Sequence, residues 1–161
     1  MIQFPGLIRD LKRGEEDAVD ALLQAAFEGK DEAALVHKLR KSGEIAGEQV
    51  LPMGDEIIGY YAISRMVAPK GWLALAPVAI RPDMQRRGLG RRMMGVLTEW
   101  ARLTKSPVVV LGNPEFYETA GFTRELAGGL TTPYPKEFTM MAGMAAPPSE
   151  TLVYSRAFDG V

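Results

Sequence analysis

The chain has 161 residues, of which 47% are hydrophobic and 24% charged, so we expect one globular domain spanning residues 1–161. Its 19 lysine and arginine residues are balanced by 20 acidic ones, and a net charge of −1 gives no general reason to expect a nucleic-acid or membrane partner. The lack of cysteine excludes disulfides and a cysteine nucleophile, and the single histidine, His37, excludes a multi-histidine metal centre, so no metal is expected.

A cytoplasmic location is the simplest expectation. Residues 1–10 lack the basic segment and apolar core of a secretion signal, and no apolar run approaches the length of a membrane helix.

The first elements in chain order are a strand and two helices. Residues 7–27 predict a short strand, a polar turn and a helix, since apolar residues from Val19 to Ala26 recur at helical spacing. Residues 31–43 predict a second helix, with Asp31 as N-cap and Gly43 as its end.

Three strands and a long helix are predicted next. Residues 44–64 read as two strands joined by a turn at Gly54–Asp55. Residues 72–80 form a nearly continuous apolar run, which is typical of a strand buried on both faces, although Pro77 is unusual there. From Leu89 the apolar residues keep helical period, and this helix should end before Pro107.

The last third of the chain predicts short elements. Residues 108–111 are a buried strand, and the pair Asn113–Pro114 has the order preferred at a helix start. Gly121 should end that helix, and residues 137–144 and 150–158 are candidate strands. This mixture of strands and helices indicates an α/β or α+β sheet with helices on both faces.

One segment concentrates positive charge. Residues 81–94, RPDMQRRGLGRRMM, contain five arginines and two glycines between an apolar strand and a helix. The free amide groups and dipole at a helix start attract anions, glycine permits close backbone approach, and arginine adds bidentate phosphate geometry. The pattern therefore predicts a diphosphate site.

Other interpretations of this segment fit less well. The third glycine and the later acidic residue of the dinucleotide fingerprint are missing, and no Gly-Lys-Ser/Thr of a P-loop is present. A basic helix start without any ligand is the remaining structural alternative.

Two motifs in order carry a family resemblance. Residues 85–90, QRRGLG, follow the strand end at 78–82 and resemble the acetyl-CoA signature of the GNAT family of N-acetyltransferases. Residues 113–122, NPEFYETAGF, resemble a later helix of that family with its Tyr-x-x-x-Gly-Phe ending. Order and spacing agree from Ile8 to roughly residue 142, and the chain is most similar to the YhbS-like branch.

The resemblance implies a GNAT-like fold, with a central mixed, mostly antiparallel sheet that contains a splayed strand pair. It further implies acetyl-CoA as co-substrate, an amine acceptor on a small molecule or a protein, and it allows a homodimer. The implied cofactor-binding residues are Val78, Ala79, Ile80, Gln85, Arg86, Arg87, Gly88, Leu89, Gly90, Arg91, Asn113 and Tyr117. Asn113 could instead serve only as a helix cap.

Two catalytic groups follow from the same resemblance. Tyr117 would be the general acid that protonates the thiolate leaving group, and the backbone N–H of Val78 would stabilise the oxyanion. The alternative for Tyr117 is packing beside Phe116. The run 72–80 has no carboxylate to act as base, so Glu48 or a water chain would remove the amine's proton.

These observations favour an acetyl-CoA-dependent N-acetyltransferase that works by direct attack in a ternary complex, since no cysteine can form a covalent intermediate. Contacts with the acceptor would come from the first two helices and from the loops 65–72 and 127–138. The alternative is a CoA- or acyl-CoA-binding module without catalysis. A nucleic-acid-binding role is weaker, because the positive charge is confined to one helix start.

Overall fold

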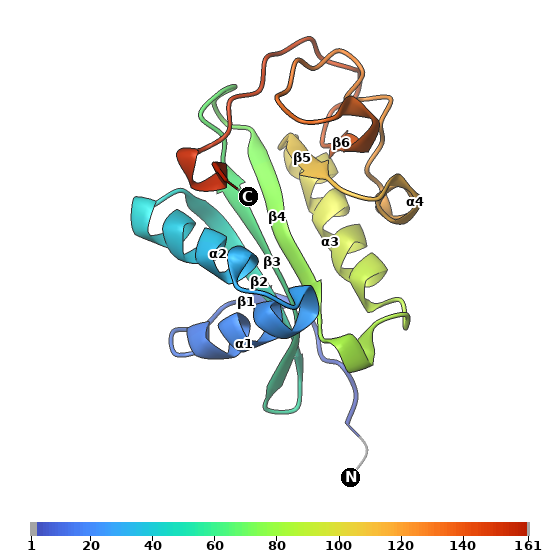
Figure 1. The fold of residues 1–161 in the computed structure, drawn as a ribbon. Helices are drawn as coiled ribbons and strands as arrows, with labels where there is room; N and C mark the ends of the chain where they lie inside the picture. The colour runs from blue at the N-terminus through green and yellow to red at the C-terminus, as the bar shows by residue number, and fades with distance from the viewer. Residues whose placement is uncertain (1–2, 161) are drawn as a thin grey trace. The chain divides into compact units, whose positions relative to one another are not determined.

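The computed structural model describes residues 3–160, which form a mixed α/β fold with a six-stranded sheet (Figure 1). The strands are hydrogen-bonded in the order β1-β2-β3-β4-β5-β6, with β1–β2 and β5–β6 antiparallel and β4–β5 parallel. The strands are β1 (Arg9–Asp10), β2 (Ile45–Met53), β3 (Glu56–Arg65), β4 (Leu73–Ile80), β5 (Val108–Leu111) and β6 (Thr139–Ala142). The α-helices are α1 (Glu16–Phe27), α2 (Asp31–Ser42), α3 (Leu89–Thr104) and α4 (Pro114–Tyr117).

The described chain divides into two compact units. The first contains the residues up to Ile63, the segment Ala76–Gly90 and the residues from Ala157 onward; the second contains Ser64–Leu75 and Arg91–Arg156.

The core of the first unit lies between the helices α1 and α2 and the strands that they cover (Figure 1). Helical spacing turns the apolar residues of each helix to one side, and alternation along the strands supplies the opposing surface. The buried cluster consists of Val19, Leu22, Leu23, Ala33, Val36, Val50, Tyr60, Ala62 and Ala79.

The ends of α2 confirm one sequence prediction and correct another. Gly43 ends the helix in the left-handed conformation, with φ 74°, as predicted. Asp31 is not the N-cap: Lys30 occupies that position, and Asp31 is the first helical residue. The carboxylate still lies in the first turn, where the helix dipole favours negative charge without a cap hydrogen bond.

In the second unit β5 lies between two strands. Val108–Val110 pair in parallel with Leu73–Leu75 and antiparallel with Met140–Ala142. The three valines are buried as predicted, whereas Leu111, the last residue of the predicted buried strand, is exposed. The side-chain oxygen of Asn113 accepts a hydrogen bond from the N–H of Glu115 (3.0 Å), which confirms the predicted start of α4.

Two predictions about the later strands need correction. Residues 150–158 are not a strand, because Thr151 and Val153 form only isolated bridges and a 3-10 turn follows at Arg156–Phe158. The strand predicted at 137–144 is shorter: Gly143 has φ 91° and lies so close to the Ser106 carbonyl that a Cβ there would be 2.0 Å from the oxygen.

The predicted burial of β4 on both faces holds only for its first half. Leu73, Ala74 and Leu75 are buried, whereas Ala76, Val78 and Ile80 are half-buried and alternate with buried residues. At the end of β4, the face that carries Ala76, Val78 and Ile80 is therefore only partly covered by the rest of the chain. Within residues 3–160, no helix is long and apolar enough to cross a membrane.

Leu23 tests the packing of α1. Leu23→Ala should lower the free energy of unfolding by about 2–5 kcal/mol, since a fully buried leucine loses its contacts and leaves a cavity. Urea denaturation would measure this loss. Leu7→Ala, at a position 87% exposed, is the matched control and should change stability by less than about 0.5 kcal/mol. Similar losses in both variants would contradict the assigned core.

Candidate functional site

The end of β4 presents its less covered face immediately before the charged turn. Ala79 belongs to the buried cluster beneath α1 and α2, so the side chains of Val78 and Ile80 lie on the opposite side of the strand. The N–H of Arg81 donates to the carbonyl of Ile58 (2.8 Å), which keeps this end of β4 attached to β3. The side-chain amide of Gln85 donates to the carbonyl of Ile80 (2.9 Å) and ties the turn back to the strand.

The turn itself has an unusual backbone. After a 3-10 turn at Pro82–Met84, Arg86 and Gly88 both adopt left-handed conformations, with φ 64° and 78°. Such a conformation is uncommon for a residue other than glycine, and left-handed residues help to build backbone concavities that bind anions. A Cβ built on Gly88 would meet no atom within 4 Å outside its chain neighbours, so this side of the backbone is open to a ligand.

The arginines of this segment differ in their pairing. Arg81 donates to Asp83 (2.7 Å) and to Glu56 (2.9 Å), so its charge is balanced locally, and this pairing lowers the pKa of Asp83. Arg86, Arg87 and Arg91 are exposed, and no ion pair to any of them is formed within residues 3–160. The first turn of α3 contains no acidic residue, so positive charge dominates this helix start.

The predicted cofactor-binding residues fall into two groups. Val78–Ile80 and Gln85–Gly90 belong to the first unit. Leu89, the first residue of α3, is buried. Arg91, Asn113 and Tyr117 belong to the second unit. The cap role of Asn113, one of its two predicted roles, is confirmed.

Tyr117 lies in an aromatic environment in the second unit. Its ring makes edge-on contacts with Phe116 (centroids 4.9 Å apart) and Phe122 (5.7 Å), so the packing predicted as its alternative role is present. Its hydroxyl makes no hydrogen bond with any part of the chain that the structure describes. Burial raises the pKa of Tyr117 to about 12, so the phenol keeps its proton at neutral pH and can donate it.

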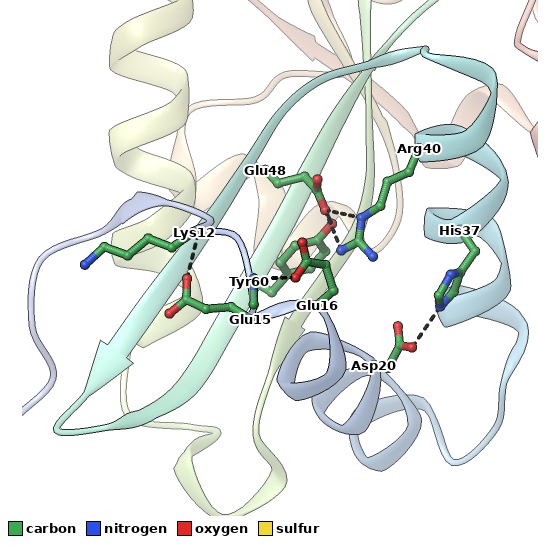
Figure 2. A network of polar contacts seen from close by, with 9 residues as sticks. Lys12, Glu15, Glu16, Asp20, His37, Arg40, Glu48 and Tyr60 are labelled. Atoms are coloured by element: carbon green, nitrogen blue, oxygen red, sulfur yellow. Dashed lines mark hydrogen bonds and ion pairs between the residues drawn. The ribbon is translucent and has the colours of Figure 1, made fainter.

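Glu48, the candidate base, is already engaged in a polar network of the first unit (Figure 2). Its Oε1 accepts hydrogen bonds from Nε (3.0 Å) and Nη2 (2.8 Å) of Arg40 and from the hydroxyl of Tyr60 (2.6 Å). Only 13% of the Glu48 side chain is exposed. Burial raises the pKa of Tyr60 well above its ordinary value, so its hydroxyl acts as a donor. This arrangement gives Glu48 a structural role that joins α2 to the sheet.

Sequence reasoning did not find this network. Arg40, Glu48 and Tyr60 come from a helix and two strands, and no motif marks them. Figure 2 also shows His37, whose Nε2 lies 2.8 Å from a carboxylate oxygen of Asp20 on the neighbouring helix α1, consistent with a structural histidine.

Comparisons with known proteins identify the class. A model of the acetyltransferase (GNAT) domain matches residues 45–124. The fold matches a crystal structure of the GNAT family N-acetyltransferase YhbS from Escherichia coli in complex with CoA, with a TM-score of 0.83 and 26% identity over 94% of this chain and 91% of that one. The chain belongs to the GNAT family of acetyltransferases.

Within that family the chain is similar to YhbS. The curated YhbS of Escherichia coli K12, described as an uncharacterized N-acetyltransferase, is 34% identical over 110 residues, which span 65% of this chain and 65% of that relative. A GNAT family acetyltransferase from Brucella melitensis, solved with acetyl-CoA, has the same fold, with a TM-score of 0.80 and 22% identity over 97% of this chain and 99% of that one.

The structural role of Glu48 is testable. Glu48→Ala should lower the free energy of unfolding by about 3 kcal/mol, because Arg40 and Tyr60 lose the acceptor of their hydrogen bonds. Chemical denaturation would measure the loss. In the control Glu99→Ala, which breaks the exposed pair with Arg102, stability should hardly change. A Glu48 variant as stable as this control would show that the network contributes nothing.

Proposed function

We propose that this protein transfers the acetyl group of acetyl-CoA to a primary amine. The observation that carries the proposal is the segment 85–91, where left-handed backbone and exposed arginines meet the start of α3 a few residues after the end of β4. Membership in the GNAT family and the CoA in the similar YhbS structure support it.

The residues present fit a diphosphate and a pantetheine arm. The amides at the start of α3 and the guanidinium groups of Arg86, Arg87 and Arg91 would hold the diphosphate. The backbone of Val78–Ile80 would hold the pantetheine arm, as an edge strand holds an extended peptide.

Acetyl transfer needs a proton donor for the leaving group. The amine nitrogen would attack the thioester carbon, and the backbone N–H of Val78 would stabilise the oxyanion that forms. When the C–S bond breaks, Tyr117 would give its proton to the sulfur, because its raised pKa keeps the phenol protonated at neutral pH. The proton of the amine would pass to water, and water would return a proton to the Tyr117 phenolate before the next turnover.

The second candidate function is a CoA-binding module without catalysis. It is favoured by the engagement of Glu48 with Arg40 and by the absence of a carboxylate in β4. The two functions differ in turnover, because a module would bind acetyl-CoA without consuming it.

Acetyl-CoA binding should raise the melting temperature. At 100 times the dissociation constant a ligand adds about 2.7 kcal/mol of stability, a shift of several degrees for a domain of this size. ATP and NAD should cause no comparable shift. Gly88→Glu should abolish the effect by placing a carboxylate in the turn, whereas Gly95→Glu, with the same charge further along α3, should retain it. No shift with acetyl-CoA or CoA in the wild-type protein would overturn the proposed site.

Tyr117→Phe should lower kcat by about 100-fold, since the general acid is lost while the ring remains. Release of the CoA thiol, followed with lysine, spermidine, ethanolamine and an alanine dipeptide as acceptors, would measure it. Tyr61→Phe is the control, because burial raises the pKa of Tyr61 to about 12 as well, in the first unit. Because Tyr117 also has a pKa of about 12, the wild-type kcat should not fall between pH 7 and pH 10 through loss of the acid. Equal kcat in Tyr117→Phe and wild type would remove Tyr117 from the mechanism, and binding without turnover would favour the module.

A further inference from the structure

Gly112 lies between the end of β5 and the start of α4, directly against the ring of Tyr117. A Cβ built on Gly112 would be 2.4 Å from Cε2, 3.0 Å from Cδ2 and 3.4 Å from Cζ of that ring. Contacts under 3.0 Å are essentially absent around real Cβ atoms, so the aromatic edge rests on the glycine backbone itself.

The backbone conformation does not explain a glycine here. Gly112 is not among the residues with positive φ, so its φ does not require a glycine. Its N–H donates to the carbonyl of Phe138 (3.0 Å), which holds this part of the backbone in place. Space for the Tyr117 ring is therefore the reason that remains.

The other contacts of Tyr117 give its ring little freedom. Phe116 and Phe122 contact it edge-on, and its own N–H donates to the carbonyl of Asn113 (3.1 Å) at the start of α4. Phe122 in turn donates its N–H to the carbonyl of Tyr117 (3.2 Å). With these contacts in place, a methyl group at Gly112 would force the ring to move by about 1 Å to reach ordinary contact distance.

We infer that Gly112 is a positioning residue for Tyr117, because its missing side chain creates the space in which the phenol ring is held. The inference rests on the proposed function for its effect on catalysis, since a general acid displaced by about 1 Å can lose about 100-fold in rate. The effect on the position of the ring is independent of that function.

The ring position is measured first, without any substrate. In protein labelled with ¹³C at the tyrosine Cζ, the signal of Tyr117 is assigned by its loss in Tyr117→Phe. In Gly112→Ala this signal should shift, because the new methyl group displaces the ring from its contacts with Phe116 and Phe122. Gly95→Ala, where a Cβ meets open space, is the control and should leave the signal unchanged. An unchanged Tyr117 signal in Gly112→Ala would overturn the inference.

A double-mutant cycle then measures the effect on catalysis, with acetyl-CoA and the best acceptor of the four amines. Gly112→Ala should lower kcat by about tenfold or more and leave the KM for acetyl-CoA within about twofold. In the Tyr117→Phe background the same change should alter kcat by less than about twofold, because the hydroxyl that it displaces is already absent. An equal loss in both backgrounds would show that Gly112 acts on something other than Tyr117, and the positioning role would be rejected.

Failure of the inference and failure of the proposed function give different results. If no amine is acetylated, or if Tyr117→Phe retains full activity, the proposed mechanism fails while the NMR signal still decides whether Gly112 positions the ring. If Gly112→Ala does not fold, the variant Gly112→Ala/Tyr117→Ala should fold again, because the three nearest atoms to the new Cβ all belong to Tyr117. A double variant that also fails to fold would overturn the inference.

Discussion

The packing of Ala79 beneath α1 and α2 is the constraint on which the first unit's part of the site depends. Because Ala79 is buried in that cluster, strand alternation leaves Val78 and Ile80 on the other side, and the chain leaves the sheet at Arg81. The hydrogen bond from Arg81 to Ile58 and the one from Gln85 to Ile80 then fix where the turn begins. A hydrophobic contact on one face of β4 thus determines which side chains lie on its other face and where the charged turn begins.

A comparable constraint organises the second unit. The buried valines of β5 pair with β4 on one side and with β6 on the other. This pairing fixes the position at which the chain leaves the sheet after Leu111. Gly112 and the Asn113 cap follow at once, and the short helix carries Tyr117 back against the glycine. The sheet interior, rather than the helix, therefore sets where the phenol lies.

Much of this could be predicted from the sequence because the signals are local. The apolar runs at 72–80 and 108–111, the hairpin turn at Gly54–Asp55 and the pair Asn113–Pro114 each determine structure within a few residues. The charged turn is predictable for the same reason, since glycine and arginine mark it directly. Single-residue errors such as the N-cap of α2 arise because acidic residues are favourable both at a cap and in the first turn.

The features that could not be predicted from the sequence depend on contacts between residues far apart in the chain, or on which of several possible partners a segment pairs with. The tail 150–158 has an apolar pattern, but single bridges replace a strand ladder there. The association of Arg40 with Glu48 and Tyr60 depends on how a helix lies over a sheet, and the reason for Gly112 depends on how a ring folds back on the backbone. Neither is encoded in a local pattern.

The three hydrogen bonds on one oxygen of Glu48 have a consequence for the evolution of this chain. A substitution that removes Arg40 or Glu48 alone leaves a largely buried charge without a partner, whereas apolar residues of similar volume at all three positions could preserve stability. Related sequences should therefore keep Arg40, Glu48 and Tyr60 as a set or replace them as a set, and sequences with one of the three changed should be rare.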